Sequence, residues 1–427
     1  MMVLKQVSLV GIISILLLSE SVAARPRQFS SLIKQGWGEA FIAQQPATSE
    51  QDATSAAAKR AFQAGEQLYQ QGTEESLRQA LVKFQEALPL YQTLDDKAQQ
   101  AETLGYIGLI YDTLGEKQKA LEFNRESLAL FREIGDKSAE AILLNNIAKV
   151  YSDLGDNQEA IAYYNQALAL ARSIDNQDLE LSIIIDLSSV YLSLGEKQQT
   201  IELLNQALQL GRTLADKTEQ INIIQYVANT YYRLGENQTA LEYYNQALSL
   251  QHTAGDQLGE ANTLFVIGSI YQNSEERIER QRAIDYYQQA LALYRDSGNL
   301  DRAAHLLIHL TQIYLSLEDT KNAANAYSTF SSLLAERATQ SEGQEQQTLQ
   351  IYQANFLRTI GDVFVNFGYR QKGLEIYQQA LLIFQTVEKV AQGELLKAAN
   401  SGVSLVLNNI GTVYDSIGDR QQALNYY

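Results

Sequence analysis

One phrase recurs along this chain at a fixed interval and decides its fold. It reads YDTLGEKQKALEF at residues 111–123, YSDLGDNQEAIAY at 151–163, YLSLGEKQQTIEL at 191–203 and YYRLGENQTALEY at 231–243. Each copy begins 40 residues after the one before it. A fixed period of this length indicates a repeat protein, in which each unit is one supersecondary element that packs on its neighbours.

The series extends beyond these four copies in both directions. Tyr271 opens a copy that contains a three-residue insertion, and Tyr314, Phe364 and Tyr414 open later copies at wider spacings. A looser copy runs through Tyr69 and Ala80 at the start of the array. We therefore predict eight complete units and a shortened ninth over residues 57–427.

The spacing of small and apolar residues predicts two antiparallel helices in each unit. Leu104, Ile107, Gly108 and Tyr111 follow the i, i+3, i+4, i+7 pattern of one helical face. The glycine of the Leu-Gly pair comes directly after this face, where a helix end favours a left-handed residue.

The second helix and its end have a pattern of their own. Small residues such as Ala160 and Ala167 let two helix axes approach closely. The pair Gly135-Asp136 then ends one helix and provides an N-cap for the next, and Ala215-Asp216 and Gly255-Asp256 repeat that arrangement. Tyrosine pairs such as Tyr163-Tyr164 recur in this helix, and we expect one ring of each pair to fill the core between repeats.

The composition agrees with a helical array and excludes several functions. Only 3 prolines occur in 427 residues, which favours long uninterrupted helices over a turn-rich β-protein. The formal charge of −17 would repel a phosphate backbone, so we do not expect nucleic-acid binding. With no cysteine and 3 histidines, thiol nucleophiles, disulfides and cysteine-ligated metals are absent, and we expect no enzymatic activity and no cofactor.

The repeated unit resembles the tetratricopeptide repeat (TPR). The small residue at Gly108, Ala148 and Gly268, the tyrosine three residues later, the Leu-Gly turn and the alanine of the second helix match that family's positions. Two departures stand out: units of 40 residues are longer than the family's usual ones, and Arg132 or Arg172 replaces the proline that usually ends the second helix. The longer form is similar to the arrays of kinesin light chains, of bacterial scaffold proteins, and of exported cyanobacterial-type proteins in which they precede a caspase-like CHAT peptidase domain.

The resemblance implies an all-α fold, a right-handed superhelical solenoid of antiparallel helix pairs, and a function in binding a protein or peptide. The first helix of each pair would line the concave side. The polar residues of that helix that lie beside its apolar stripe are then candidate groove residues: Asn145, Asn146, Lys149, Gln225, Asn229, Tyr232, Arg233, Asn262, Arg358, Asn408 and Asn409. Amides can clamp an extended peptide backbone, and the cations can receive carboxylates. Solvation of a concave surface by these polar residues is the alternative.

Two more specific functions that the family suggests find little support in the residues. The clamp with which related arrays hold a chaperone tail needs lysine where this chain has Asn145, Ile185 and Gln225. A CHAT peptidase needs a Cys/His pair, and this chain has no cysteine. This chain therefore cannot be the peptidase domain itself. The alternative function that the resemblance implies is an N-terminal sensor or regulatory region of a longer CHAT-type peptidase.

His305 and His309 have the four-residue spacing of a two-histidine metal site on a helix. No glutamate follows His305 to complete an HExxH motif, so we expect histidines of the groove or of the core edge and no bound metal.

Both ends of the chain carry further expectations. Residues 1–5 are basic and residues 7–18 are apolar, a run too short for a bilayer, which requires about 20 residues. We interpret residues 1–24 as a signal peptide, with an uncleaved anchor as the alternative, and residues 25–56 as a linker. The protein is then exported, periplasmic or secreted. At the other end, a stop within the ninth unit would expose Ile410, Val413, Tyr414 and Leu424, which suggests a fragment of a longer protein.

Overall fold

The computed structural model describes residues 49–214 and 216–427, and the predicted signal peptide and most of the predicted linker lie outside these residues. The described chain forms eighteen helices, and no strand occurs within it. The chain divides into two compact units, Met1–Ala240 and Leu241–Tyr427. The boundary falls within α12 (Asn237–Ala254), and each unit is described by itself.

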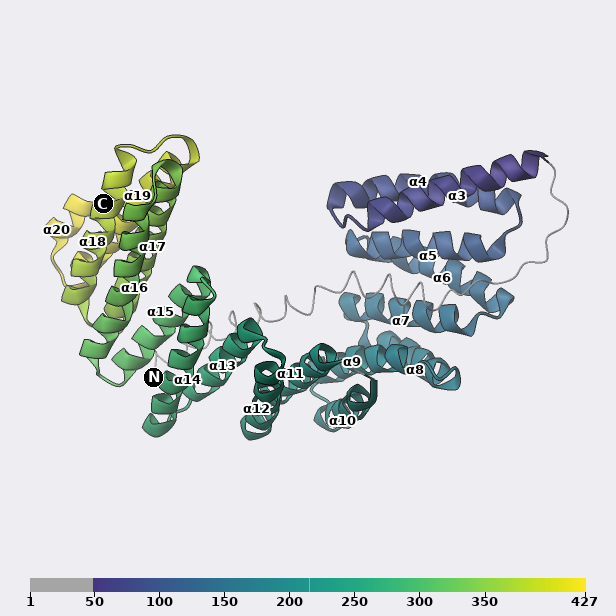
Figure 1. Ribbon diagram of the computed structural model, residues 1–427, viewed down its shortest axis with the longest axis horizontal. Coiled ribbons are helices and arrows are strands. Elements are labelled where there is room, and N and C mark those ends of the chain that lie inside the picture. Colours follow the sequence, from purple (N-terminus) through teal and green to yellow (C-terminus); the bar gives the residue numbers. More distant parts are fainter. Residues whose placement is uncertain (1–48, 215) are drawn as a thin grey trace. The chain divides into compact units, whose positions relative to one another are not determined.

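The helices of the first unit form successive antiparallel pairs, each corresponding to one predicted repeat (Figure 1). They are α3 (Ser49–Tyr69), α4 (Glu74–Thr93), α5 (Lys97–Thr113), α6 (Lys117–Ile134), α7 (Lys137–Leu154), α8 (Asn157–Ser173), α9 (Gln177–Ser193), α10 (Lys197–Leu214) and α11 (Lys217–Arg233). Each second helix also packs on the first helix of the following pair.

The second unit continues the same arrangement with longer helices towards its end. They are α13 (Gln257–Gln272), α14 (Arg277–Asp296), α15 (Leu300–Ser316), α16 (Thr320–Gln340), α17 (Gly343–Asn366), α18 (Arg370–Glu388), α19 (Gly393–Ser416) and α20 (Arg420–Tyr426). The prediction of an all-α solenoid built from helix pairs is thereby confirmed.

The predicted helix ends are also confirmed. Gly135 ends α6 at φ 82°, and the Asp136 side chain accepts a hydrogen bond from the Ala139 backbone N–H at 2.9 Å. Asp256 caps α13 in the same way, on the Gly259 N–H. At the position that corresponds to Gly135, Asp175 adopts a left-handed φ of 54°, a conformation that costs more for a residue with a Cβ.

Rings from the second helices fill the core against small residues of the first helices. Tyr287 is fully buried and lies over Gly268, where an added Cβ would come within 2.6 Å of the ring. Tyr377 lies over Gly361 in the same way, at 2.5 Å. Tyr164 is also buried, whereas its neighbour Tyr163 is only partly buried. One tyrosine of each pair is thus a core residue, as predicted.

Two expectations about the ends of the array need correction. The first helix begins at Ser49, so the end of the predicted linker belongs to α3. Ile410 and Val413 are 0% and 2% exposed, because the seven-residue α20 packs on α19 and covers them. Tyr414 stacks on Tyr426 at a centroid distance of 5.5 Å. Leu424, at 71% exposure, is the member of that set that does face solvent.

The contact between Gly268 and Tyr287 predicts the cost of added volume. We expect Gly268→Ala to lower the free energy of unfolding by about 1–3 kcal/mol, because the methyl group overlaps a ring that is itself fixed by packing. Chemical denaturation of the two proteins measures the difference. In the background of Tyr287→Leu, whose side chain is smaller, the same substitution should cost less. An equal cost in both backgrounds would show that the added methyl group does not meet the ring.

Candidate functional site

The first helices of the pairs form one continuous surface in each unit. Successive first helices approach one another more closely than successive second helices do: α5 contacts α7 and α7 contacts α9 in the first unit, and α15 contacts α17 and α17 contacts α19 in the second. A stack of pairs bends towards the side where its helices are closer. We call this inner surface of the odd-numbered helices the first-helix face.

The predicted site residues of α7 differ sharply in exposure. Asn145 and Asn146 are only 2% and 6% exposed, and the Asn145 Oδ1 has no hydrogen-bond partner. Lys149, one turn further along the same helix, is exposed. The two amides that the sequence predicts as peptide contacts are therefore largely buried, whereas the Lys149 side chain is exposed to solvent.

The predicted residues of α11 show the same division. Gln225, Asn229 and Tyr232 are partly buried and all interact with other parts of the chain. Their neighbour Tyr226 shares a 2.7 Å hydrogen bond with the Ser188 hydroxyl on α9, which ties consecutive first helices together. Arg233 at the end of α11 is exposed. Lys149 and Arg233 are therefore the charged members of the predicted set that face solvent in the first unit.

In the second unit, the structure brings Arg358 and Asn409 together through a residue that the sequence did not suggest. Asp362 on α17 accepts hydrogen bonds from the Tyr377 hydroxyl at 2.5 Å and from the Asn409 amide at 2.7 Å, both on Oδ1. Arg358 Nη1 lies 3.3 Å from Oδ2, and the Arg358 Nε is buried without a partner. Burial raises the pKa of the Asp362 carboxyl, although Tyr377 and Arg358 both act against that shift. Asp362 lies four residues after Arg358, so the helical period was the signal that could have found it.

The other two predicted residues of this unit lie apart from this network. Asn408 is exposed on α19. Asn262 on α13 accepts a 2.6 Å hydrogen bond from the Tyr294 hydroxyl, so its oxygen completes the bonding of a buried tyrosine.

An acidic group on the first-helix face at α3 and α5 was also missed from the sequence. Glu66 accepts a 3.2 Å hydrogen bond from the Tyr106 hydroxyl. Burial raises the pKa of the nearby Glu102 carboxyl to about 7, and the charge of Glu66 adds to this effect. Glu66 and Glu102 belong to different repeats, so no spacing within one helix indicates that they lie close together.

His305 and His309 lie in an aromatic cluster. Their rings are 5.0 Å apart, and the Phe265 ring packs against both. His309 is 4% exposed, and its Nδ1 lies 3.2 Å from the Gln272 Oε1. Within residues 49–214 and 216–427, no group of three or more histidine, aspartate or glutamate side chains is arranged to hold a metal ion.

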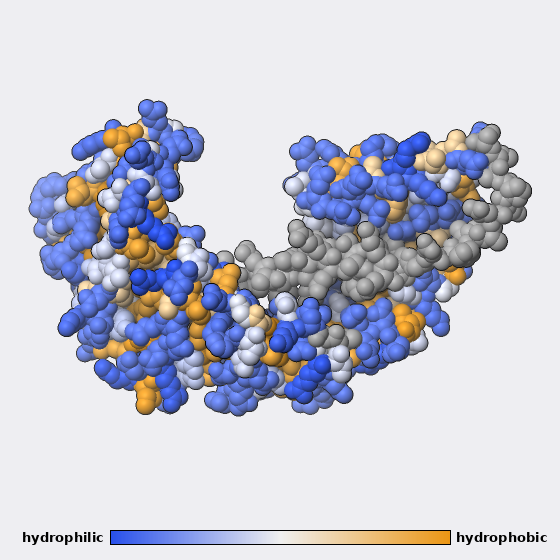
Figure 2. All heavy atoms as spheres, viewed as in Figure 1, coloured by the Kyte–Doolittle hydropathy of each residue, from blue (hydrophilic) through white to orange (hydrophobic). Residues whose placement is uncertain are grey.

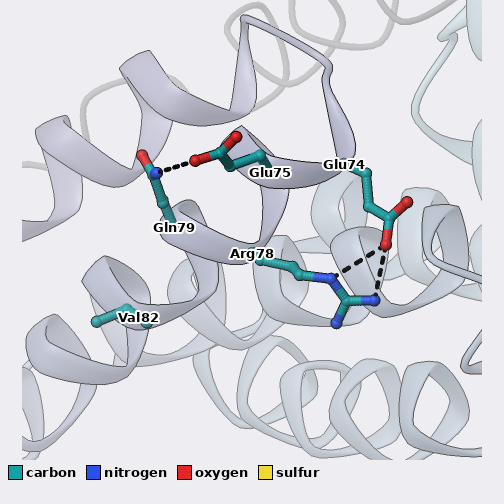
Figure 3. A pocket seen from close by; sticks show the side chains of 5 residues that line it. All are labelled: Glu74, Glu75, Arg78, Gln79 and Val82. Atoms are coloured by element: carbon teal, nitrogen blue, oxygen red, sulfur yellow. Dashed lines mark hydrogen bonds and ion pairs between the residues drawn. The ribbon is translucent and has the colours of Figure 1, made fainter.

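A surface depression on α4 is a weaker candidate for a binding site. Its lining residues, Glu74, Glu75, Arg78, Gln79 and Val82, all come from one helix (Figure 3). Arg78 pairs with Glu74 at 2.9 Å, and both side chains are largely exposed. Exposed i,i+4 pairs of this kind are common on helix surfaces and contribute little.

Comparison with protein families identifies the class of protein. A tetratricopeptide repeat model matches residues 139–213, and a model of the soluble NSF attachment protein, SNAP, matches residues 216–351. The chain is a TPR-type repeat protein. No curated protein sequence matches it.

Several solved structures resemble the chain at low sequence identity. Aspartyl phosphate phosphatase F from Bacillus subtilis is 15% identical, with 90% of this chain and 94% of that chain covered and a TM-score of 0.44. The quorum sensor NprR from B. thuringiensis is 16% identical, with 84% and 96% covered and a TM-score of 0.39. BtubC (BKLC) from P. vanneervenii is 21% identical, with 56% and 94% covered and a TM-score of 0.39.

The buried His309 predicts how stability depends on pH. Burial lowers the pKa of His309 to about 3, so the unfolded chain binds a proton at this residue that the folded chain does not bind between about pH 6.5 and 3. The free energy of unfolding should therefore fall as the pH falls through this window, by up to about 1.4 kcal/mol per pH unit from this residue.

The variant His309→Leu removes this titration, and denaturation curves at several pH values between 4 and 8 measure its effect. We expect a shallower loss of stability below pH 6.5 in the variant than in the wild type. Parallel pH profiles for the two proteins would mean that His309 is not buried in its neutral form.

Proposed function

We propose that this protein is an exported interaction scaffold that binds a protein or peptide partner on its first-helix face. The observation that carries the proposal is the pair of exposed cations on the first-helix face of the first unit, Lys149 and Arg233. Neither forms an ion pair with any other residue of the described chain. In a protein with 50 acidic and 33 basic residues, cations that stay unpaired on the inner surface are available for a partner.

The chemistry of this surface favours carboxylates of the partner. A lysine binds a carboxylate as a point charge, and an arginine can bind one through two parallel hydrogen bonds. Lys117, in contrast, is held between Asp112 at 2.7 Å and Asp153 at 2.5 Å. The protein therefore carries both paired and unpaired cations, and only the unpaired ones on the first-helix face are proposed to bind the partner.

The network around Asp362 would serve as a rigid part of the corresponding surface in the second unit. Its four side chains come from three helices, so they fix α17, α18 and α19 relative to one another. A preformed surface loses less entropy when it binds a partner than a mobile one does. Arg358 and Asn409 thus support a binding surface, and the exposed Asn408 beside them is available for contact.

Peptide selection on the full chain tests the proposed surface. A displayed library of random peptides should yield sequences with recurrent acidic positions on the wild-type protein. Lys149→Ala combined with Arg233→Ala should weaken the binding of a selected synthetic peptide at least tenfold, because two charge-assisted contacts are lost. The melting temperature should change little, since both side chains are exposed.

A matched double variant controls for net charge. Lys321→Ala combined with Arg337→Ala removes one lysine and one arginine from α16, a second helix, where both are exposed. This variant should bind the selected peptide as the wild type does. Equal weakening by both double variants, or selection of no recurrent sequence at all, would rule out the proposed surface.

Export of the protein is proposed from its first residues, which lie outside the described part of the chain. The basic start, the short apolar run and the small residues before Arg25 support cleavage after residue 24. Bacterial cells that express the full gene should yield a periplasmic or secreted protein whose mass corresponds to a start at Arg25. A full-length protein found in the cytoplasm would contradict this proposal. Among the described helices, none combines the length and the apolarity of a membrane span.

The alternative proposal is a regulatory region of a longer CHAT-type peptidase, and it rests on the resemblance of the repeats alone. The 427 residues contain no cysteine, so the nucleophile of such a peptidase would have to lie on sequence beyond them. The gene sequence downstream distinguishes the two proposals, because only the alternative requires a Cys/His-containing domain there.

A further inference from the structure

A cavity of about 250 Å³ lies between α14, α15 and α16 in the second unit. These three helices follow one another directly in the stack (Figure 1). Its apolar lining includes Leu307, Leu310 and Phe330, and its polar lining includes Arg295 and the Tyr314 side chain. Two departures from the repeat pattern, at Ala326 and Ala303, account for its shape and its charge.

The first departure removes a ring. In four other repeats, a ring from the second helix stacks on the tyrosine that opens the repeated phrase, at centroid distances of 5.4 or 5.5 Å and interplanar angles of at most 18°: Tyr111–Phe123, Tyr151–Tyr163, Tyr271–Tyr286 and Tyr414–Tyr426. Ala326 follows Tyr314 by the same 12 residues that separate Tyr111 from Phe123. Where other repeats lack the ring, they carry the bulky Leu203 or Ile376. Ala326 therefore leaves one side of the Tyr314 ring open, and that space is part of the cavity.

The second departure removes a carboxylate. In two other repeats, an arginine near the end of the second helix pairs with a glutamate eight residues later: Arg132 with Glu140 at 2.7 Å and Arg172 with Glu180 at 2.6 Å. Ala303 stands eight residues after Arg295. Arg295 is exposed, and it forms no ion pair with any residue in the part of the chain that the structure describes.

We propose that this cavity binds a ligand that carries an aromatic ring and a carboxylate. The ring stacks on Tyr314 in the space left by Ala326, and the carboxylate binds the Arg295 guanidinium in place of the missing glutamate. The ligand thus supplies two groups that several of the other repeats supply from their own chain. A 3.1 Å hydrogen bond from the Gln288 amide to the Tyr314 hydroxyl holds the receiving ring in place.

Three kinds of interaction favour the binding of such a ligand: aromatic stacking, burial of apolar surface and hydrogen bonds to a charged group. Stacking on an aromatic ring adds to the gain from burying apolar surface, and the leucines beneath provide that surface. An arginine binds a carboxylate through charge-assisted hydrogen bonds, which are stronger than neutral ones. A concave site with apolar walls and a few polar groups is typical of ligand pockets. The cavity lies beside the second helices α14 and α16, so the inference does not depend on the first-helix face.

The same chemistry has two sources, a free aromatic acid or the carboxyl-terminal aromatic residue of a polypeptide. We would titrate the full chain with N-acetyl-L-phenylalanine, with its amide, and with the peptide Gly-Gly-Gly-Gly-Phe with a free carboxyl terminus. Saturable binding of both acids with about tenfold weaker binding of the amide is the expected result. Tighter binding of the peptide than of the free acid would assign the site to a chain end, and the reverse order would assign it to a small molecule.

Two variants and one control variant test whether the ligand binds in this cavity. Arg295→Gln should weaken N-acetyl-L-phenylalanine about tenfold and leave the amide unchanged. Ala326→Tyr should abolish binding and raise the melting temperature, because it restores the stacking found in the other repeats and so shows that the variant is folded. Arg337→Gln, an exposed arginine on α16 outside the cavity, should bind as the wild type does. The proposal fails if neither acid binds, if acid and amide bind equally, or if Ala326→Tyr still binds the acid.

Discussion

The fold depends on one contact that recurs between the two helices of a pair: a large side chain of the second helix lies directly over a small residue of the first. Gly65 receives Phe84, Gly268 receives Tyr287 and Gly361 receives Tyr377, each at a distance that leaves no room for a Cβ. The contact sets the distance between the two helix axes. Because each pair in turn forms the surface for the next, an error in that distance would propagate along the array. In these pairs the helix spacing therefore depends on both the small residue and the large one.

This packing also determines which polar residues remain available for binding. A tyrosine in the core brings a hydroxyl that needs a hydrogen-bond partner where water is excluded. The first helices supply it: Gln272 accepts from Tyr287 at 2.6 Å, Asp362 from Tyr377 at 2.5 Å and Asn262 from Tyr294 at 2.6 Å. Several polar side chains beside the apolar stripe of the first helices thus complete the bonding of the core. On the face of the molecule seen in Figure 2, hydrophilic side chains predominate among the coloured residues, with smaller groups of apolar ones between them.

The helix pairs, the capping residues and the buried tyrosines were predictable from the sequence because each depends on residues close together in the chain. A helical face needs only the 3.6-residue period, and a cap such as Asp136 needs only its own turn. The candidate binding residues were less predictable, because their environment depends on the neighbouring repeat. Asn145 has the same local pattern as a groove residue, yet it is 2% exposed. The i,i+4 spacing from Arg358 could have indicated Asp362, but its contacts with Tyr377 and Asn409 could not be predicted, because those residues belong to other helices. Leu424 and Ile410 were expected to share one exposed face, and only the packing of α20 separates them.

A repeat array makes departures from its own pattern informative in a way that a single globular domain does not. Where Ala326 stands in place of a stacked ring, the loss of stability is limited to one helix pair and its neighbours. The array as a whole therefore tolerates it. The other copies show what that position normally contributes, and the difference defines the shape and the charge of what is missing. At Arg295 the missing group is a carboxylate, and at Tyr314 it is a ring. The same reasoning separates Lys149 and Arg233 from the many paired charges of the surface, since Lys117 and Arg132 show how this protein neutralises a cation when no partner is to bind it. Binding sites in this chain are therefore best sought where one repeat lacks a side-chain group that other repeats carry at the same position.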